Sequence, residues 1–250
     1  MTDHFVGTMK GVILNIFPRA NIVDITHDVA PFEINEGAFV IAQAYRYFPK
    51  KTVHVIVVDP GVGSERRPIL AEMAGQYFVA PDNGVLSMIY SREEKKKVRH
   101  ITSDKYFLQP VSRTFHGRDV FAPVGAHLAA GEPAARFGKT IDDYVKLAIG
   151  KPVRTGKRVW SGTILKVDRF GNLITNLHID DFEDVRSRPF ELNVGLQQTS
   201  RMASTFSESA PGELFAVVGS SGYIEVAVNQ GSAAKMLGVA SGSPVELTLY

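Results

Sequence analysis

The sequence contains no cysteine, and this absence removes three kinds of chemistry at once. Disulfide cross-links, thiolate nucleophiles and zinc sites with cysteine ligands all require that residue. A chain of 250 residues can be stabilised by a packed core alone, and the lack of cysteine fits a reducing compartment. No apolar run approaches the ~20 residues that span a membrane, and the first residues do not form a signal peptide. The sequence therefore predicts a cytoplasmic protein that does not enter a membrane.

An excess of charge of one sign is also missing. The 28 basic and 26 acidic side chains leave a net charge of +2, which gives no reason to expect a nucleic acid as a partner. The sequence has no His-Glu-x-x-His zinc motif, no Gly-x-x-x-x-Gly-Lys-Ser/Thr phosphate loop and no Gly-x-Gly-x-x-Gly motif after a strand. These absences predict a protein without a metal site and without a bound nucleotide cofactor.

The first part of the chain alternates between helical and strand-like patterns, which is typical of an α/β domain. Apolar residues spaced three and four apart predict helices over residues 5–17, 32–47, 85–90 and 120–130. Short apolar runs predict strands over residues 21–25, 52–58, 69–74 and 76–80. The first helix should have Thr2 or Asp3 as its N-cap. Together these elements predict an N-terminal α/β domain, residues 1–148, with a central, mostly parallel sheet.

The pattern changes beyond a linker near residues 146–157. Short strands then follow one another at residues 163–167, 173–177, 190–194, 214–219, 223–229 and 244–249. Residues 157–250 are therefore predicted to form a smaller, mainly β C-terminal domain.

Polar residues stand at the junctions between several predicted strands and helices of the first domain. VDPGVG at residues 58–63 and APDNG at residues 80–84 each follow a strand, and FHGRD at residues 115–119 precedes a helix. Asp59, Arg66 and His116 have the side chains of a water-activating site, because a carboxylate can orient an imidazole and a guanidinium can hold that carboxylate ionised. The alternative is that these residues have no catalytic role: Asp59 then caps a turn, and His116 is a helix cap or a surface group.

Two stretches of the second domain have the chemistry of a ligand site. DRFGN at residues 168–172 provides a carboxylate, an aromatic ring and an amide. These groups suit a ligand that carries both a positive charge and a nucleobase. The other stretch combines Phe206 with GSSGY at residues 219–223, where glycines beside two serines allow a ligand to approach the backbone closely. An ordinary turn and an ordinary hairpin are the alternatives for these two stretches.

Taken together, these stretches resemble the S-adenosyl-L-methionine (SAM) hydroxide adenosyltransferases, the water-using relatives of the fluorinating and chlorinating enzymes. The resemblance also includes FVGTMKG at residues 5–11 and PFEINEGA at residues 31–38, so seven blocks match in order. It implies hydrolysis of SAM to adenosine and L-methionine by attack of an activated water on C5′. SAM would be a small-molecule substrate and no cofactor would be needed. The resemblance also implies a homotrimer with sites between subunits.

The resemblance assigns roles to individual residues. The family's water-activating trio falls on Asp59, Arg66 and His116, where the halogenating relatives carry uncharged or tyrosyl residues. Asp168 matches the carboxylate near the methionine ammonium group, and Asn172 matches the amide beside adenine. The full set of residues expected to bind substrate is Phe32, Asp168, Phe170, Asn172, Phe206, Ser220, Glu225 and Val228.

Two other functions fit the same residues. A nucleoside hydrolase would release free adenine, whereas a SAM or nucleoside sensor would bind its ligand without turnover. The resemblance also implies an opening apolar strand and a turn whose aspartate holds the ribose hydroxyls, and Asp3 does not match that aspartate. We therefore expect a shortened form that binds substrate weakly and tends to associate.

Overall fold

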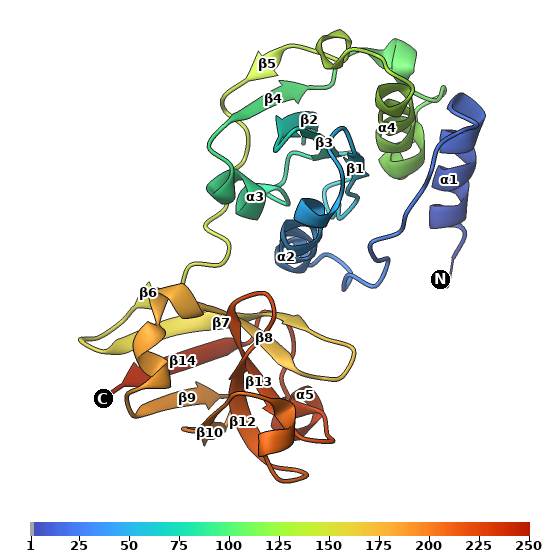
Figure 1. The fold of residues 1–250 in the computed structure, drawn as a ribbon. Helices are drawn as coiled ribbons and strands as arrows, with labels where there is room; N and C mark the ends of the chain where they lie inside the picture. The colour runs from blue at the N-terminus through green and yellow to red at the C-terminus, as the bar shows by residue number, and fades with distance from the viewer. Residues whose placement is uncertain (1–2) are drawn as a thin grey trace. The chain divides into compact units, whose positions relative to one another are not determined.

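A computed structural model of the protein describes residues 3–250. The chain forms two compact units, Met1–Ile149 and Gly150–Tyr250, each with its own sheet (Figure 1).

The sheet of the first unit is mixed, so the prediction of a mostly parallel sheet is wrong. Its strands are β1 (Val53–Val55), β2 (Pro68–Met73), β3 (Gln76–Pro81), β4 (Lys96–His100) and β5 (Thr140–Ile141), in the spatial order β1-β3-β2-β4-β5. The β1–β3 ladder is parallel, whereas β3–β2, β2–β4 and β4–β5 are antiparallel. The reason lies in the turn between β2 and β3, where Ala74 and Gly75 both have positive φ angles, 52° and 75°. Such a two-residue turn reverses the chain, so β2 and β3 must run antiparallel.

Helices cover both faces of this sheet. They are α1 (Phe5–Ile16), α2 (Ile34–Ala44) with a 3₁₀ extension (Tyr45–Tyr47), α3 (Ser87–Arg92) and α4 (Ala122–Ala129), which a π-helical turn (Gly117–Phe121) precedes. Short 3₁₀ turns occupy Asp104–Tyr106 and Ala134–Arg136. These elements confirm the predicted helices to within a few residues.

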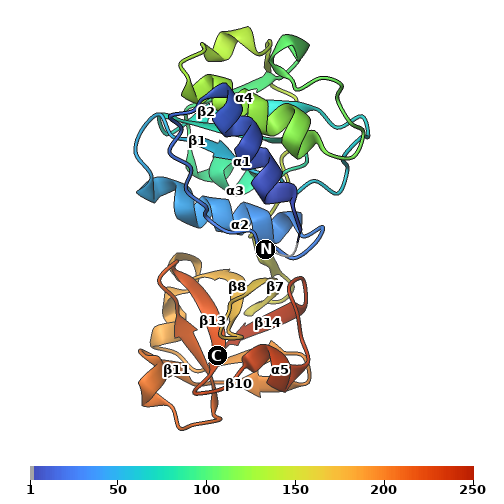
Figure 2. The same ribbon diagram turned by 90° about the vertical axis from the view of Figure 1, so that its right-hand side faces the viewer.

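Neighbouring residues of β3 show how the two faces are covered. Val79 belongs to a buried cluster with Val124 and Leu128 of α4. Phe78 meets the ring of Tyr45, directly after α2, with centroids 5.8 Å apart. Because adjacent strand residues point to opposite faces, α4 and the end of α2 lie on opposite sides of the sheet. Helix α1 runs beside α4 (Figures 1 and 2).

Three local predictions for the first unit need comment. Residues 21–25, all within the described part of the chain, form no strand, and Val23 and Ile25 are exposed there. A β-branched run without a neighbouring strand has no ladder to join. The expected strand at residues 52–58 is short, because only Val53–Val55 forms a ladder. The N-cap of α1 is His4, which makes no side-chain capping hydrogen bond, so the prediction of Asp3 as the N-cap is wrong, although Asp3 accepts a 3.0 Å hydrogen bond from the Phe5 N–H. Thr2 lies outside the described residues.

The second unit is mainly β, as predicted. Its sheet follows the order β10-β9-β14-β7-β8-β13-β12-β11, and β6 pairs with β7. The strands are β6 (Val153–Arg154), β7 (Val159–Val167), β8 (Leu173–His178), β9 (Phe190–Val194), β10 (Gln197–Thr199), β11 (Met202–Ala203), β12 (Leu214–Val218), β13 (Tyr223–Val228) and β14 (Pro244–Leu249). Three 3₁₀ turns (Ile179–Asp181, Glu183–Arg186 and Phe206–Glu208) and helix α5 (Ala233–Leu237) complete the unit. All six predicted strands are confirmed, and β6, β10 and β11 are too short to give a sequence pattern.

Strand β7 joins the two halves of this sheet. Its residues 159–163 pair with β14, and its residues 164–167 pair with β8, with a register shift between Ile164 and Lys166. The halves enclose one apolar cluster that includes Ile164, Leu192, Ile224 and Leu247. Strand β13, which carries Glu225 and Val228, is buried along its whole length.

Candidate active site

The loop between β1 and β2 carries two of the predicted catalytic residues. It follows Val55, the last residue of β1, turns through Gly61 and Gly63, and passes Arg66 before β2 begins at Pro68. The Ser64 hydroxyl donates a 2.6 Å hydrogen bond to the Gly61 carbonyl, and the Val62 N–H donates one of 3.3 Å to the Asp59 carbonyl. These short-range contacts fold the loop back, so residues seven positions apart can meet.

Asp59 and Arg66 form a buried, two-pronged ion pair. Arg66 Nε donates to Asp59 Oδ1 at 2.9 Å, and Arg66 Nη2 donates to Oδ2. The side chains of Arg66 and Asp59 are only 8% and 5% exposed. The guanidinium also lies over the ring of Phe121, 5.2 Å from its centroid. A planar guanidinium held by two carboxylate contacts and an aromatic face has one orientation.

His116 completes the trio at the same guanidinium nitrogen. Arg66 Nη2 donates to His116 Nδ1 at 2.7 Å. Burial, followed by the Arg66 cation, lowers the pKa of the imidazole, against the opposing effects of Asp59, Asp119 and a backbone hydrogen bond to Ser112. A guanidinium can only donate, so Nδ1 must accept and the neutral ring carries its proton on Nε2. The predicted trio is therefore in contact, with the histidine in a defined tautomer.

A π-helical turn places His116. The turn begins directly after this residue, and such turns occur frequently at functional sites. Asp119 within the turn is fully buried, and its Oδ2 accepts a 2.8 Å hydrogen bond from the Ser112 N–H. Arg118 donates to the same carboxylate. These contacts fix the chain on both sides of His116.

In the second unit, Asp168 and Asn172 form a closed polar turn. Asp168 Oδ1 accepts hydrogen bonds from the backbone N–H groups of Phe170 at 2.8 Å and Asn172 at 2.9 Å. Its Oδ2 accepts a third, from Asn172 Nδ2, at 2.9 Å. Each carboxylate oxygen has more than one lone pair, so Asp168 can still accept from a ligand cation. The turn arranges Asp168 and Asn172 and leaves the Phe170 ring exposed.

Glu225 lies buried near this turn. Burial, followed by the charge of Asp168, raises the pKa of the Glu225 carboxyl to about 7. A Cβ added at Gly219 would lie only 1.8 Å from Glu225 Oε1, so glycine leaves room for this side chain directly before Ser220. The structure thus brings Asp168, Glu225 and the Gly219–Ser220 backbone into one region of the second unit.

The other predicted substrate residues are more scattered. Phe32 precedes α2 with a positive φ of 71° and is highly exposed. Phe206 is partly exposed and meets Phe215 edge to face, with ring centroids 5.9 Å apart. The Val228 side chain is buried in the core of the second unit, which leaves only its backbone for a ligand. Exposed aromatic rings suit stacking on a base, so Phe32, Phe170 and Phe206 stay candidates.

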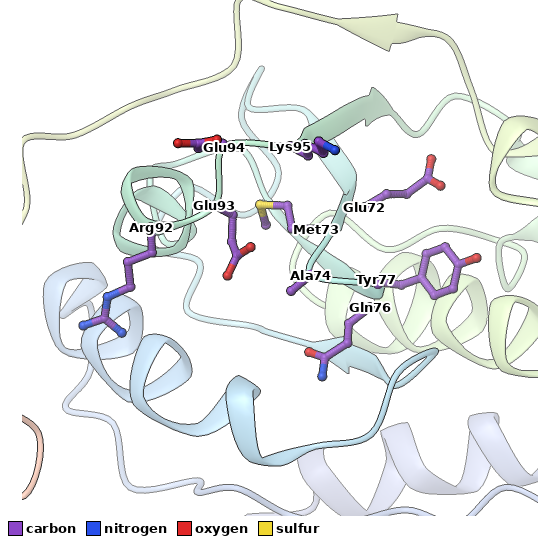
Figure 3. Close-up of a pocket in the computed structure, with 10 residues that line it drawn as sticks. Glu72, Met73, Ala74, Gln76, Tyr77, Arg92, Glu93, Glu94 and Lys95 are labelled. Carbon is purple, nitrogen blue, oxygen red and sulfur yellow. The ribbon is translucent and has the colours of Figure 1, made fainter.

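A cavity of about 610 Å³ lies elsewhere in the first unit, beside the β2–β3 turn and the end of α3 (Figure 3). None of the predicted site residues lines it. Two of its polar side chains already have partners within the fold: Glu93 accepts from the Tyr45 hydroxyl at 2.6 Å, and Gln76 Nε2 donates to the Phe48 carbonyl at 2.7 Å. Over residues 3–250, no group of three or more His, Cys, Asp or Glu side chains is placed to hold a metal ion. In the same range, no helix is long and apolar enough to cross a membrane.

Two family models match the chain: the SAM hydroxide adenosyltransferase N-terminal domain over residues 1–138 and the C-terminal domain over residues 162–246. The chain belongs to this family. An (R)-S-adenosyl-L-methionine hydrolase from Salinispora tropica is 38% identical, with 99% of this chain and 94% of that protein covered. A hydrolase of the same name from Methanocaldococcus jannaschii is 36% identical, with 95% and 88% covered.

A more distant relative and a solved structure also match nearly the whole chain. A fluorinase from Actinoplanes is 28% identical over 99% of this chain and 94% of its own length. The crystal structure of an uncharacterized conserved protein from Thermotoga maritima has a TM-score of 0.90 and 38% identity. The match covers 99% of this chain and 96% of the Thermotoga maritima chain. This member of the SAM hydroxide adenosyltransferase family therefore has relatives that match nearly its whole length.

Sequence reasoning missed the residues that support the trio in this family member. Asn83 Nδ2 donates to the Val58 carbonyl at 2.8 Å, and Asp82 Oδ2 accepts from Arg67 Nη2 at 2.7 Å. The polar APDNG stretch was visible in the sequence as a turn after a strand. Nothing in its spacing indicated that it would contact the chain next to Asp59 and Arg66.

Proposed function

We propose that the protein hydrolyses SAM to adenosine and L-methionine through attack of a water molecule on C5′. Membership of the SAM hydroxide adenosyltransferase family and the similarity to named (R)-S-adenosyl-L-methionine hydrolases support this function. The observation that carries it is the contact of one nitrogen, Arg66 Nη2, with both Asp59 and His116. This contact places a carboxylate and an imidazole side by side in a buried part of the molecule.

The proposed reaction has a simple bond balance. A bond forms between the water oxygen and C5′ while the C5′–S bond breaks, and the bonding electron pair leaves with sulfur. The sulfonium thereby becomes the neutral thioether of methionine, and water loses one proton. A sulfonium is already a good leaving group, so we propose that neither a metal nor a cofactor takes part. Orientation of the water can lower the barrier by ~7 to 11 kcal/mol, and a positioned base can add a factor of ~10² to 10⁴.

Within the trio, each residue has a separate role. Neutral His116 carries its proton on Nε2 and can donate a hydrogen bond to the water oxygen. Asp59 keeps lone pairs that Arg66 does not use, and it accepts the proton that the water loses. Arg66 fixes the orientation of both groups. A donor and an acceptor for one water are thus provided by two neighbouring side chains.

The residues that would bind the rest of SAM form a second part of the proposal. Phe32, Phe170 and Phe206 would provide aromatic surfaces, Asn172 an amide for adenine, and Asp168 a carboxylate for the methionine ammonium group. Ser220, Glu225 and Val228 would contact the ligand from the loop before β13 and from β13 itself. We also propose the finer organisation expected from the sequence: domains at residues 1–148 and 157–250, a homotrimer with sites between subunits, and a cytoplasmic location.

Product analysis tests the function directly. Purified protein is incubated with SAM in the presence of EDTA, and the products are separated by chromatography. We expect adenosine and L-methionine in equal amounts. Adenine as the product would instead indicate a nucleoside hydrolase, and tight binding without turnover would indicate a SAM sensor. Loss of turnover in EDTA would contradict the metal-independent mechanism.

A further inference from the structure

A polar turn after β3 contacts the residue that precedes Asp59. The turn consists of Asp82, Asn83 and Gly84, directly after Pro81, the last residue of β3. Asn83 Nδ2 donates a 2.8 Å hydrogen bond to the Val58 carbonyl, while Asn83 Oδ1 accepts from the Val85 N–H at 3.1 Å. The Asn83 side chain therefore links the start of the β1–β2 loop to the start of the chain that leads into α3.

The neighbouring residue, Asp82, contacts the other end of the same loop. Asp82 Oδ2 accepts from Arg67 Nε at 3.0 Å and from Nη2 at 2.7 Å, and the Asp82 N–H donates to the Arg67 carbonyl at 2.8 Å. The second carboxylate oxygen, Oδ1, accepts from the Val145 N–H at 2.8 Å. The Asp82 side chain is 3% exposed, so loss of one of these partners would leave a buried charge poorly compensated.

The two ends of the loop are thus held by consecutive residues. Val58 directly precedes Asp59, and Arg67 directly follows Arg66. Between Asp59 and Arg66, the Ser64 hydroxyl makes only short-range hydrogen bonds, to the Gly61 carbonyl and from the Arg66 N–H, and several of these loop residues are exposed. Short-range bonds in an exposed loop do not by themselves fix the distance between its ends. The Asp82–Asn83 turn can help the Asp59–Arg66 ion pair to fix it, because two consecutive residues of one turn contact both ends.

We propose that Asp82 and Asn83 are positioning residues, which clamp the two ends of the β1–β2 loop and thereby hold Arg66 against both Asp59 and His116. This proposal rests on the proposed function, because it assigns the clamp to the water-activating trio. Asp82 and Asn83 act through Val58 and Arg67, and no contact with substrate is required of them.

The exposed partner of Arg67 offers a matched control. Arg67 Nη1 donates to Asp143 Oδ1 at 2.9 Å, and Arg67 Nη2 donates to the Asp143 carbonyl at 2.9 Å. The Asp143 side chain is 77% exposed, in contrast to Asp82. An exposed ion pair contributes little, so Asp143→Asn should leave the loop in place. Asp82→Asn makes the same chemical change at the buried partner of the same arginine.

Kinetics of Asn83→Ala, Asp82→Asn and Asp143→Asn provide the first test. For the first two variants, we expect kcat to fall tenfold to a hundredfold, because a misplacement of about 1 Å is enough for such a loss. KM should stay within about twofold, since SAM contacts are unchanged. Asp143→Asn should match the wild type. Circular dichroism establishes which variants are folded, and either clamp variant carries the test if the other does not fold.

Titration of the His116 ring by NMR provides a second test that does not need turnover. The charged groups that act on this ring are Arg66, Asp59 and Asp119, and Arg66 is the one that lowers its pKa. Displacement of Arg66 should therefore move the His116 titration to higher pH in both clamp variants, and not in Asp143→Asn.

The outcomes separate the clamp from the reaction. If wild-type protein forms no adenosine, the proposed function fails, and the His116 titration still tests the clamp. If wild-type protein is active and folded clamp variants keep their kcat, the clamp is wrong while the function stands. Equal changes in Asp143→Asn and Asp82→Asn would also overturn the clamp, because any loss of charge near Arg67 would then have the same effect.

Discussion

Arg66 contacts both other members of the trio through a single nitrogen atom, Nη2. The proposed function assigns water activation to residues of the first unit and most of the substrate binding to residues of the second. In the proposed mechanism, Asp59 and His116 act on water, whereas Asp168 and Phe206 of the second unit bind SAM. Substitutions in the two groups should therefore have different kinetic consequences.

We expect Asp59→Asn and His116→Ala to lower kcat far more than they weaken SAM binding, because the replaced groups act on water. A general base contributes a factor of ~10² to 10⁴, so the loss in kcat for Asp59→Asn should fall in that range, and His116→Ala should lower kcat because it removes the donor that orients the water. Asp168→Ala and Phe206→Ala should mainly raise KM, since they remove contacts shared by ground and transition states. Steady-state kinetics with calorimetric binding measures both effects. Equal loss of affinity in the two groups of variants would contradict the assignment.

Glu225 gives a prediction about stability and pH. Its carboxyl has a pKa of about 7 in the folded protein, against an ordinary value of 4.5. Between these two pH values the folded state binds a proton that the unfolded state has released, so the free energy of unfolding should fall as pH rises from 4.5 to 7. The loss is on the order of 1 to 3 kcal/mol. Glu225→Gln should remove this dependence.

Urea denaturation at pH 5 and pH 8 measures the effect. Relative to wild type, Glu225→Gln should gain stability at pH 8. The matched control is Glu246→Gln, which changes an exposed glutamate on β14 of the same unit. If Glu246→Gln shows the same change between the two pH values, burial of Glu225 is not the cause.

At the scale of elements, the β1–β2 loop depends on one glycine. Gly63 has a φ of +78°, and a Cβ at this position would lie 2.3 Å from the Arg113 carbonyl oxygen. Gly63→Ala should therefore displace the loop from the segment that leads to His116. We expect a loss of more than ~2 kcal/mol in unfolding free energy, together with a large decrease in kcat.

Gly212→Ala is the control for backbone strain alone. Gly212 has a nearly identical φ of +79°, but a Cβ there would meet nothing within 4 Å. Gly212→Ala should lower the free energy of unfolding by only ~1 to 2 kcal/mol and leave kcat unchanged. Chemical denaturation and SAM turnover compare the two variants. A similar stability loss in both would show that the Arg113 contact is unimportant.

Some helices, strands and contacts could be predicted from the sequence, and others could not. The helices of the first unit and the six longer strands of the second were predicted because their apolar spacing is regular. The mixed sheet was not predicted, since strand direction depends on turn geometry and on partners distant in the sequence. Asp59, Arg66 and His116 were selected by side-chain type and family resemblance, but spacings of 7 and 50 residues do not reveal contact. The proposed Asp82–Asn83 clamp consists of one hydrogen bond across 25 positions and three across 15 positions, and contacts this far apart leave no periodic pattern in the sequence.

At the scale of the whole molecule, the proposed trimer can be tested by mixing variants. Sedimentation should give a mass three times the 27.4 kDa of one chain. If each site takes the trio from one chain and Asp168 from another, a mixture of Asp59→Asn and Asp168→Ala chains should recover activity at low SAM concentration. The chains are mixed after reversible unfolding, and each variant refolded alone is the control. A mixture no more active than the two variants refolded separately would mean that each site is built from one chain.

The position of β14 bears on how the protein is made. This strand, Pro244–Leu249, lies between β7 and β9 in the interior of its sheet. The first unit has all its strands by Ile141, so it can fold on the ribosome while the remainder is still being translated. The second unit cannot complete its sheet until its last residues have left the exit tunnel. A premature stop codon directly before β14 would therefore release a chain with one folded unit and one open, aggregation-prone sheet.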